Sequence, residues 1–207
     1  MAEQHRKWTT DQMPDQTGKR IIITGANSGL GYESTLALAR KGAHVIMACR
    51  NTTKGQEALD RVKQQVPDAK LDLMALNLGD LQSVRDFAAA YINQYDSLDV
   101  LMNNAGIMAP KQRRTTTDGF ELQFGVNHLG HFALTGLLLG VLLDTPESRV
   151  VTVSSSFHRQ GKIHFDNLQG ERDYDGYTFY AQSKIANVYF TQELQRQFTA
   201  INASQSA

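Results

Sequence analysis

The stretch RIIITGANSGLG, at residues 20–31, decides the fold of this chain. A run of isoleucines ends in three closely spaced glycines, and a helical pattern follows over residues 29–41. Glycine suits such a turn because a side chain would block the tight bend, the approach of the backbone to a phosphate and the packing of helix on strand. The N–H groups that begin the helix attract the phosphates of a dinucleotide. The residues that we expect to meet this cofactor are Gly25, Asn27, Ser28, Gly29, Leu30 and Gly31.

Strands and helices are predicted to alternate along the rest of the chain. Apolar runs rich in β-branched residues are separated by helical patterns, which is typical of parallel strands joined by crossover helices. The expected strands lie at residues 20–24, 43–48, 71–77, 99–103 and 149–154. The expected helices lie at residues 29–41, 54–65, 81–94, 119–143 and 179–198. We therefore expect one Rossmann-like, doubly wound α/β domain over residues 18–199, between a polar extension (residues 1–17) and a polar tail (residues 200–207).

The composition excludes several classes of function. The 207 residues are 41% hydrophobic and 20% charged, with zero formal net charge, as in an ordinary globular protein. The basic residues are scattered, so we expect no nucleic acid partner but a small molecule. The longest apolar stretch, residues 132–143, is too short to span a bilayer. The single cysteine, Cys49, and a polar N-terminus without a signal peptide favour the reducing cytoplasm.

The run YAQSK, at residues 180–184, is the strongest candidate for proton chemistry. Residues four apart share one face of a helix, so Tyr180 and Lys184 would project side by side. A phenol next to a fixed cation ionises more readily, which brings it into the range where it can exchange a proton near neutral pH. The pair therefore indicates a general acid-base site.

Four motifs in this order resemble the short-chain dehydrogenase/reductase family: TGANSGLG (24–31), NNAG (103–106), VSS (153–155) and YAQSK (180–184). Each lies at the carboxyl end of a predicted strand or on the next helix, where open α/β sheets bind ligands. The stretches NHLGHF (127–132) and YAQSKIAN (180–187) are similar to the retinol-dehydrogenase-like group. The stretch HVIMACR (44–50) is similar to light-dependent protochlorophyllide reductases, so reduction of a carbon–carbon double bond is the rival enzymatic interpretation.

The resemblance implies interconversion of a carbonyl and an alcohol, with a distinct role for each catalytic residue. Tyr180 would exchange the proton, and Lys184 would support it and bind the nicotinamide ribose. Ser155 would stabilise charge on the substrate oxygen, and Asn127 would hold a water relay behind the lysine. The resemblance also implies a homo-oligomer, because the helices that hold Asn127 and Tyr180 pack against a second subunit in the family. Further cofactor contacts implied in this way are Asn77, Leu78, Asn104, Ala105, Gly106, Tyr180 and Lys184.

The end of the second predicted strand decides between NAD and NADP. An acidic side chain there would bind the ribose hydroxyls, whereas an arginine would pair with a 2′-phosphate. This chain has Arg50 between Cys49 and Asn51, with Lys54 nearby and no carboxylate, so NADP is favoured. The family usually has Asp-Leu after the third strand, and the Asn77 found here would weaken the adenine contact without abolishing it.

The spacing of the histidines does not indicate a metal site. No cluster with metal-ligand spacing accompanies His128, His131, His158 and His164, so we expect structural or surface histidines and no metal.

The chain stops soon after the catalytic helix, which predicts a C-terminally truncated fold whose fifth strand is a bare edge. The alternative function is therefore a truncated, non-catalytic nucleotide-binding module, or a fragment that needs a partner.

Overall fold

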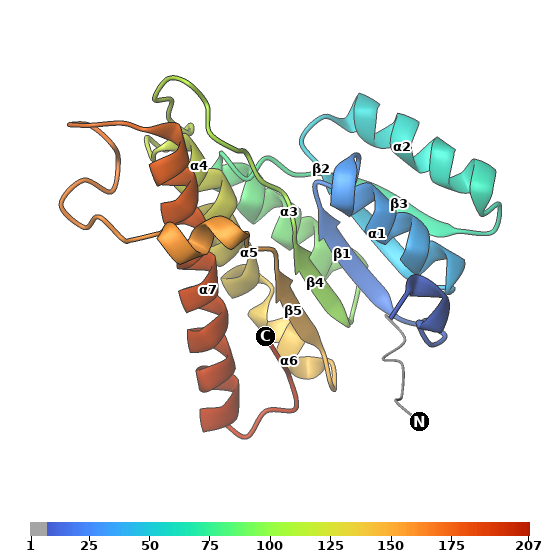
Figure 1. The fold of residues 1–207 in the computed structure, drawn as a ribbon. Helices are drawn as coiled ribbons and strands as arrows, with labels where there is room; N and C mark the ends of the chain where they lie inside the picture. Colours follow the sequence, from blue (N-terminus) through green and yellow to red (C-terminus); the bar gives the residue numbers. More distant parts are fainter. Residues whose placement is uncertain (1–7) are drawn as a thin grey trace, which may run out of the picture.

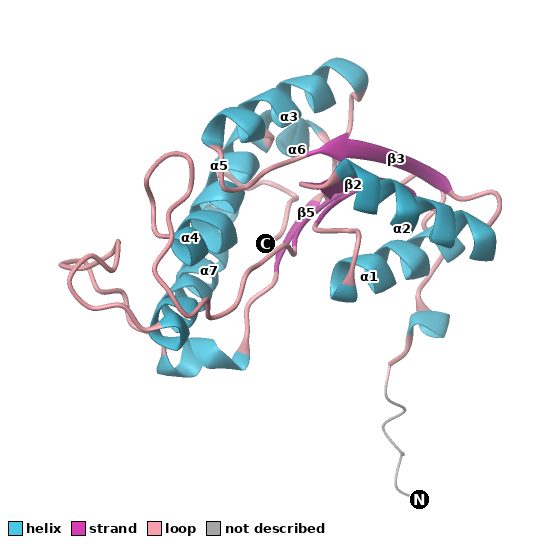
Figure 2. Cartoon of the chain, turned by 90° about the horizontal axis from the view of Figure 1, so that it is seen from above, coloured by secondary structure: helices cyan, strands magenta, loops and turns pink. Residues whose placement is uncertain are grey.

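A five-stranded parallel sheet with helices on both faces forms the computed structural model, which describes residues 8–207 (Figures 1 and 2). The strands are β1 (Arg20–Thr24), β2 (His44–Cys49), β3 (Lys70–Ala75), β4 (Val100–Asn103) and β5 (Arg149–Thr152). Their order is β3-β2-β1-β4-β5, and all four pairings are parallel. The predicted Rossmann-like fold and single domain are confirmed.

The two faces of the sheet build two apolar cores. Successive residues of a strand point to opposite faces, and β1 is apolar on both. Ile21 and Ile23 pack with helices α1 (Gly29–Arg40) and α2 (Thr52–Gln65). Ile22 packs in the core that holds residues of α3 (Leu81–Gln94), α5 (Gly130–Leu137) and α6 (Leu139–Asp144). Helix α7 (Gly176–Ala200) runs along this second side (Figure 1).

Most element boundaries lie within two residues of the prediction, and side-chain caps explain the earlier starts of two helices. Helix α2 begins at Thr52 because the Asn51 side chain accepts a hydrogen bond from the Lys54 backbone N–H. Helix α7 begins at Gly176, three residues before the predicted start, because Asp175 caps it.

The single helix predicted over residues 119–143 is wrong. The chain instead forms α4 (Leu122–Phe124), a π-helical turn η2 (Gly125–Leu129), α5 and α6. Next to η2, the His131 ring Nδ1 lies 3.1 Å from the Asn127 carbonyl oxygen. Leu138, with φ −94° and ψ 2°, separates α5 from α6. Gly130 allows this region to pack closely, because a Cβ there would lie 2.5 Å from the Leu78 carbonyl oxygen.

The described residues near both ends of the chain contact the domain. Residues 1–7 of the predicted extension lie outside the described residues, and the 3₁₀ helix η1 (Thr10–Gln12) is joined to the end of α1 through a bond from Lys41 Nζ to the Asp11 carbonyl. In the polar tail, Ser206 forms a parallel bridge with Arg149, at the start of β5. The remainder of β5 is an edge, where Val151 is 44% exposed. None of the helices within residues 8–207 has the length and hydropathy needed to cross a membrane.

Candidate active site

A cleft of about 620 Å³ opens at the carboxyl ends of the strands, around the point where β1 has β2 on one side and β4 on the other. Ligands bind at such a switch point in open α/β sheets. The predicted residues that line it are Gly25, Asn27, Ser28, Leu30, Arg50, Asn77, Leu78, Asn104, Ala105, Gly106, Ser155, Tyr180 and Lys184. Gly29, Gly31 and Asn127 lie outside its lining.

The glycine turn has the shape that a pyrophosphate requires. Gly25 has φ +67°, a conformation that residues with a side chain rarely adopt. A Cβ at Gly31 would contact the Gly25 carbonyl and lie 2.7 Å from the Asn104 side-chain nitrogen. The lack of a side chain at Gly31 therefore allows the turn to pack against Asn104. Ser28 and Leu30, at the start of α1, line the cleft, and a helix N-terminus favours phosphate. These residues fit a dinucleotide.

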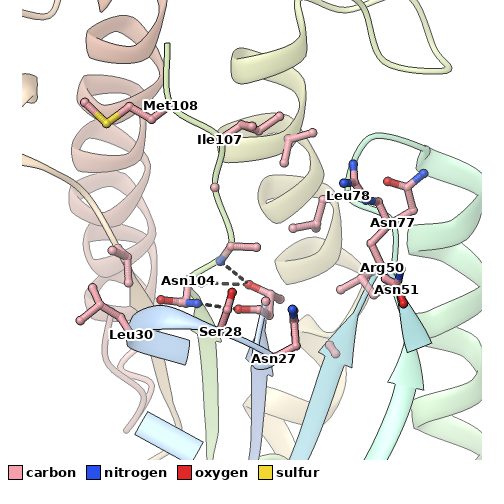
Figure 3. A pocket seen from close by; sticks show the side chains of 18 of the residues that line it. Asn27, Ser28, Leu30, Arg50, Asn51, Asn77, Leu78, Asn104, Ile107 and Met108 are labelled. Atoms are coloured by element: carbon pink, nitrogen blue, oxygen red, sulfur yellow. Dashed lines mark hydrogen bonds between the residues drawn. The ribbon is translucent and has the colours of Figure 1, made fainter. Parts of the chain in front are cut away.

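The loop after β4 is fastened to the glycine turn through Thr24 (Figure 3). The Thr24 hydroxyl oxygen accepts from the backbone N–H groups of Asn104 and Ala105, both at 2.9 Å. The Asn104 side chain returns a bond of 2.8 Å to the Thr24 carbonyl. The two segments that would contact the cofactor therefore form one unit.

One end of the cleft carries positive charge. Arg50, Asn51 and Asn77 lie together there in Figure 3, and Lys54 also contributes to the lining. Arg50 is exposed, and no Asp or Glu of residues 8–207 lines the cleft. The Asn77 side-chain oxygen accepts from the Gly79 backbone N–H at 3.1 Å, and this bond stabilises the turn over residues 77–79. This end suits a group with negative charge.

Ser155, Tyr180 and Lys184 line another part of the cleft. The Lys184 ammonium donates to the Val153 carbonyl at 3.0 Å and lies 5.7 Å from the centre of the Tyr180 ring. Burial lowers the pKa of Lys184 to about 8. The neighbouring Ser154 hydroxyl donates to the Lys184 carbonyl, so this serine supports α7.

Asn127 is fully buried and acts through neighbouring residues. Its side chain accepts from the Ile107 N–H at 2.8 Å and donates to the Ile107 carbonyl and to the Ser183 hydroxyl, each at 2.9 Å. A Cβ at Gly106 would lie 3.3 Å from Asn127 Oδ1 and 3.6 Å from Lys184 Nζ. Gly106 therefore lies beside both the Asn127 amide and the Lys184 ammonium.

His131 is a buried structural histidine whose tautomer follows from its partners. The Thr24 hydroxyl already accepts two N–H bonds, so its proton is directed to His131 Nε2 at 2.8 Å. The Nδ1 nitrogen then carries the hydrogen and donates to the Asn127 carbonyl. Burial lowers the pKa of His131 to about 4, which keeps the ring neutral. Within residues 8–207 no group of His, Cys, Asp and Glu could hold a metal ion.

Residues 19–203 match the sequence model of a family described as short chain dehydrogenase. The chain belongs to the short-chain dehydrogenase/reductase family. It is 45% identical to human Retinol dehydrogenase 11 over 188 residues, which are 91% of this chain and 58% of that protein. It is 43% identical to mouse (Mus musculus) Retinol dehydrogenase 14 over 197 residues, with 90% and 59% covered. The chain thus lies in the retinol-dehydrogenase-like branch and spans less than three fifths of the length of these relatives.

Solved structures of short-chain dehydrogenases share the fold. A crystal structure of an uncharacterised protein from Mycobacterium paratuberculosis superposes with a TM-score of 0.85 at 45% identity, covering 96% of this chain and 69% of that one. A short chain dehydrogenase from Shigella flexneri 2a complexed with NADP superposes with a TM-score of 0.73 at 25% identity, covering 91% and 75%.

Several residues of the site were not among the predicted site residues. Ile107 and Met108 line the cleft directly after the NNAG motif, in a loop without a periodic pattern. Val153 holds Lys184 with its backbone carbonyl, which any residue could provide. Thr24 could have been found, because a hydroxyl residue ends β1 immediately before the glycine turn.

Proposed function

We propose that this chain carries an NADP-dependent oxidoreductase site that interconverts a carbonyl and an alcohol. The main observation is the group of Ser155, Tyr180 and Lys184 in one cleft with the glycine turn. When bound, the nicotinamide cofactor supplies the hydride. Proton transfer and stabilisation of charge are left to the protein.

In this proposal Tyr180 gives its phenolic proton to the carbonyl oxygen, or takes the proton of the alcohol in reverse. Lys184, held by the Val153 carbonyl, stabilises the negative charge that Tyr180 then carries. Ser155 donates a hydrogen bond to the substrate oxygen. Asn127 keeps the Ile107 backbone in place behind the lysine.

The preference for NADP is supported by the positive end of the cleft. Arg50 and Lys54 would bind the 2′-phosphate, and the start of α2, capped by Asn51, adds free N–H groups. The glycine turn would hold the pyrophosphate, and Asn77 and Leu78 would face the adenine. The similar Shigella dehydrogenase was solved with NADP, which agrees with this choice.

We also propose that the protein is a homo-oligomer in the cytoplasm. Phe132 of α5 and Tyr189 of α7 are 56% and 55% exposed, and such aromatic surface favours association. The Phe132 ring lies 5.6 Å from that of Phe190, also on α7, so the two helices present aromatic side chains together. The buried thiol of Cys49 is compatible with a reducing compartment.

The test is turnover of NADPH with a panel of aldehydes and ketones. Tyr180→Phe removes one hydroxyl, so it should lower kcat by about 10² or more while NADPH affinity stays within about threefold. Tyr177→Phe, at an exposed neighbouring tyrosine that stacks on Phe157, is the matched control and should retain the rate. NADPH binding without turnover would instead favour the non-catalytic module, and turnover confined to carbon–carbon double bonds would favour the rival reductase.

A further inference from the structure

Gln123 is a fully buried amide that joins its own turn to two other segments of the chain. Its side-chain oxygen accepts from the Ala109 backbone N–H at 2.7 Å. Its side-chain nitrogen donates to the Gly176 carbonyl at 2.9 Å and to the Tyr174 hydroxyl at 3.2 Å. Both N–H groups and the carbonyl of the amide are thus in use, which an apolar side chain of the same size could not reproduce.

The segments joined by Gln123 surround the part of the cleft near Tyr180. Ala109 directly follows Ile107 and Met108, which line the cleft. Gly176 begins α7, one turn before Tyr180. The loop and the helix start are in direct contact, since a Cβ at Gly176 would lie 2.6 Å from the Pro110 carbonyl oxygen.

Glu121 holds the residues that lead into α7, residues 161–175, at the same place. The Glu121 backbone N–H donates to the Gln169 side chain at 2.6 Å, and its carboxylate lies 3.4 Å from the Tyr174 hydroxyl. The carboxylate also caps α4 by accepting from the Phe124 N–H at 2.7 Å. The turn that carries Gln123 is therefore itself held by the hydrogen bonds of the Glu121 backbone and of the Glu121 carboxylate.

We propose that Gln123 is a positioning residue that fixes the wall of Ile107 and Met108 against the first turn of α7, and so sets the geometry of the substrate end of the cleft. The inference rests on the proposed function, because the reaction occurs next to Tyr180. Arg50 and the glycine turn have no bond to Gln123, so cofactor binding should not depend on it.

The test compares Gln123→Met with Gln205→Met. Gln205 is a matched control because it is also buried and donates to two backbone carbonyls, those of Leu143 and Thr145, at the start of β5 away from the cleft. Tyr174→Phe is a milder variant that removes one partner of Gln123 and preserves the ring stacked on Phe179. Each variant is measured for NADPH affinity, for kcat and KM with a carbonyl substrate, and for amide hydrogen exchange over residues 107–110.

Gln123→Met should lower kcat/KM by at least about tenfold and speed exchange over residues 107–110, while NADPH affinity stays within about threefold. Tyr174→Phe should shift the same quantities less, and Gln205→Met should shift neither. Unchanged kcat/KM, an equal loss in Gln205→Met, or a parallel loss of NADPH affinity would overturn the inference. If the wild-type chain turns over no carbonyl, the proposed function fails separately; faster exchange at 107–110 in Gln123→Met would still support the positioning role, and unchanged exchange would reject it.

Discussion

Arg50 is the residue on which cofactor choice depends most directly. Arg50→Asp replaces a partner for a 2′-phosphate with an acceptor for ribose hydroxyls. The ratio of NADPH to NADH affinity should fall by more than about tenfold, or about 1.4 kcal/mol, in titrations of both nucleotides. Arg85→Asp makes the same charge change at an exposed position on α3 and should leave the ratio unaltered. Equal ratios in all three proteins would remove Arg50 from the cofactor site.

Lys184 should make activity depend on pH. Its pKa is lowered to about 8 by burial, so the ammonium that supports Tyr180 is lost as pH rises through about 8, and kcat/KM should fall there. A flat profile from pH 7 to 9.5 would contradict this role.

The same lowered pKa predicts how stability changes with pH. Between about pH 8 and the ordinary lysine pKa of 10.5, Lys184 is neutral in the folded state and charged in the unfolded state, so the free energy of unfolding rises with pH. The stability gained in this way is fully present above pH 10.5 and is lost as pH falls through about 8. Lys184→Met lacks it, so the free energy of unfolding of the wild type relative to this variant should rise over that interval by up to about 3 kcal/mol. Parallel stability curves would show that the ammonium is not buried as described.

At the scale of an element, helix α5 holds the buried His131 ring next to the π-helical turn η2. The pKa of His131 is lowered to about 4, whereas an unfolded histidine titrates near 6.5, so its contribution to stability is present above 6.5 and lost as pH falls toward 4. His131→Gln has no group that titrates in this range. Unfolding by urea at several pH values should therefore show a steeper loss in the wild type than in His131→Gln between pH 6.5 and 4. His128, whose pKa burial also lowers, is present in both proteins and cancels from the comparison.

The elements differ in how well the sequence predicts them, for physical reasons. Strand β1 has the predicted bounds because continuous apolar residues fill both cores and the glycine turn ends the strand. The π-helical turn η2 and the break at Leu138 interrupt the helix predicted over residues 119–143, and hydropathy does not record either change of backbone geometry. Tyr180, Lys184 and Ser155 could be placed from motifs, whereas the anchoring by Gln123 joins segments about 50 residues apart and leaves no local pattern.

At the scale of the whole molecule, β5 is one of the two edge strands of the sheet, and β3 is the other. Ser206 pairs only with its start, and Val151 remains 44% exposed. We expect concentrated protein to associate along this edge, and Val151→Lys to lower the mass seen by light scattering, because a lysine there disfavours pairing with another strand. Ile201→Lys, at a 60% exposed position after α7, is the control with the same change of charge. Equal masses for both variants would exclude β5 as the contact.

The bonds of Thr24 to the loop after β4 also have a kinetic consequence. Because the Thr24 hydroxyl accepts from two backbone N–H groups of the loop after β4, we expect the two walls that receive the nucleotide to move together. We then expect the nucleotide to bind a preformed cleft in one step. The observed binding rate should therefore increase linearly with nucleotide concentration. Differences in affinity between nucleotides then arise mainly from their dissociation rates.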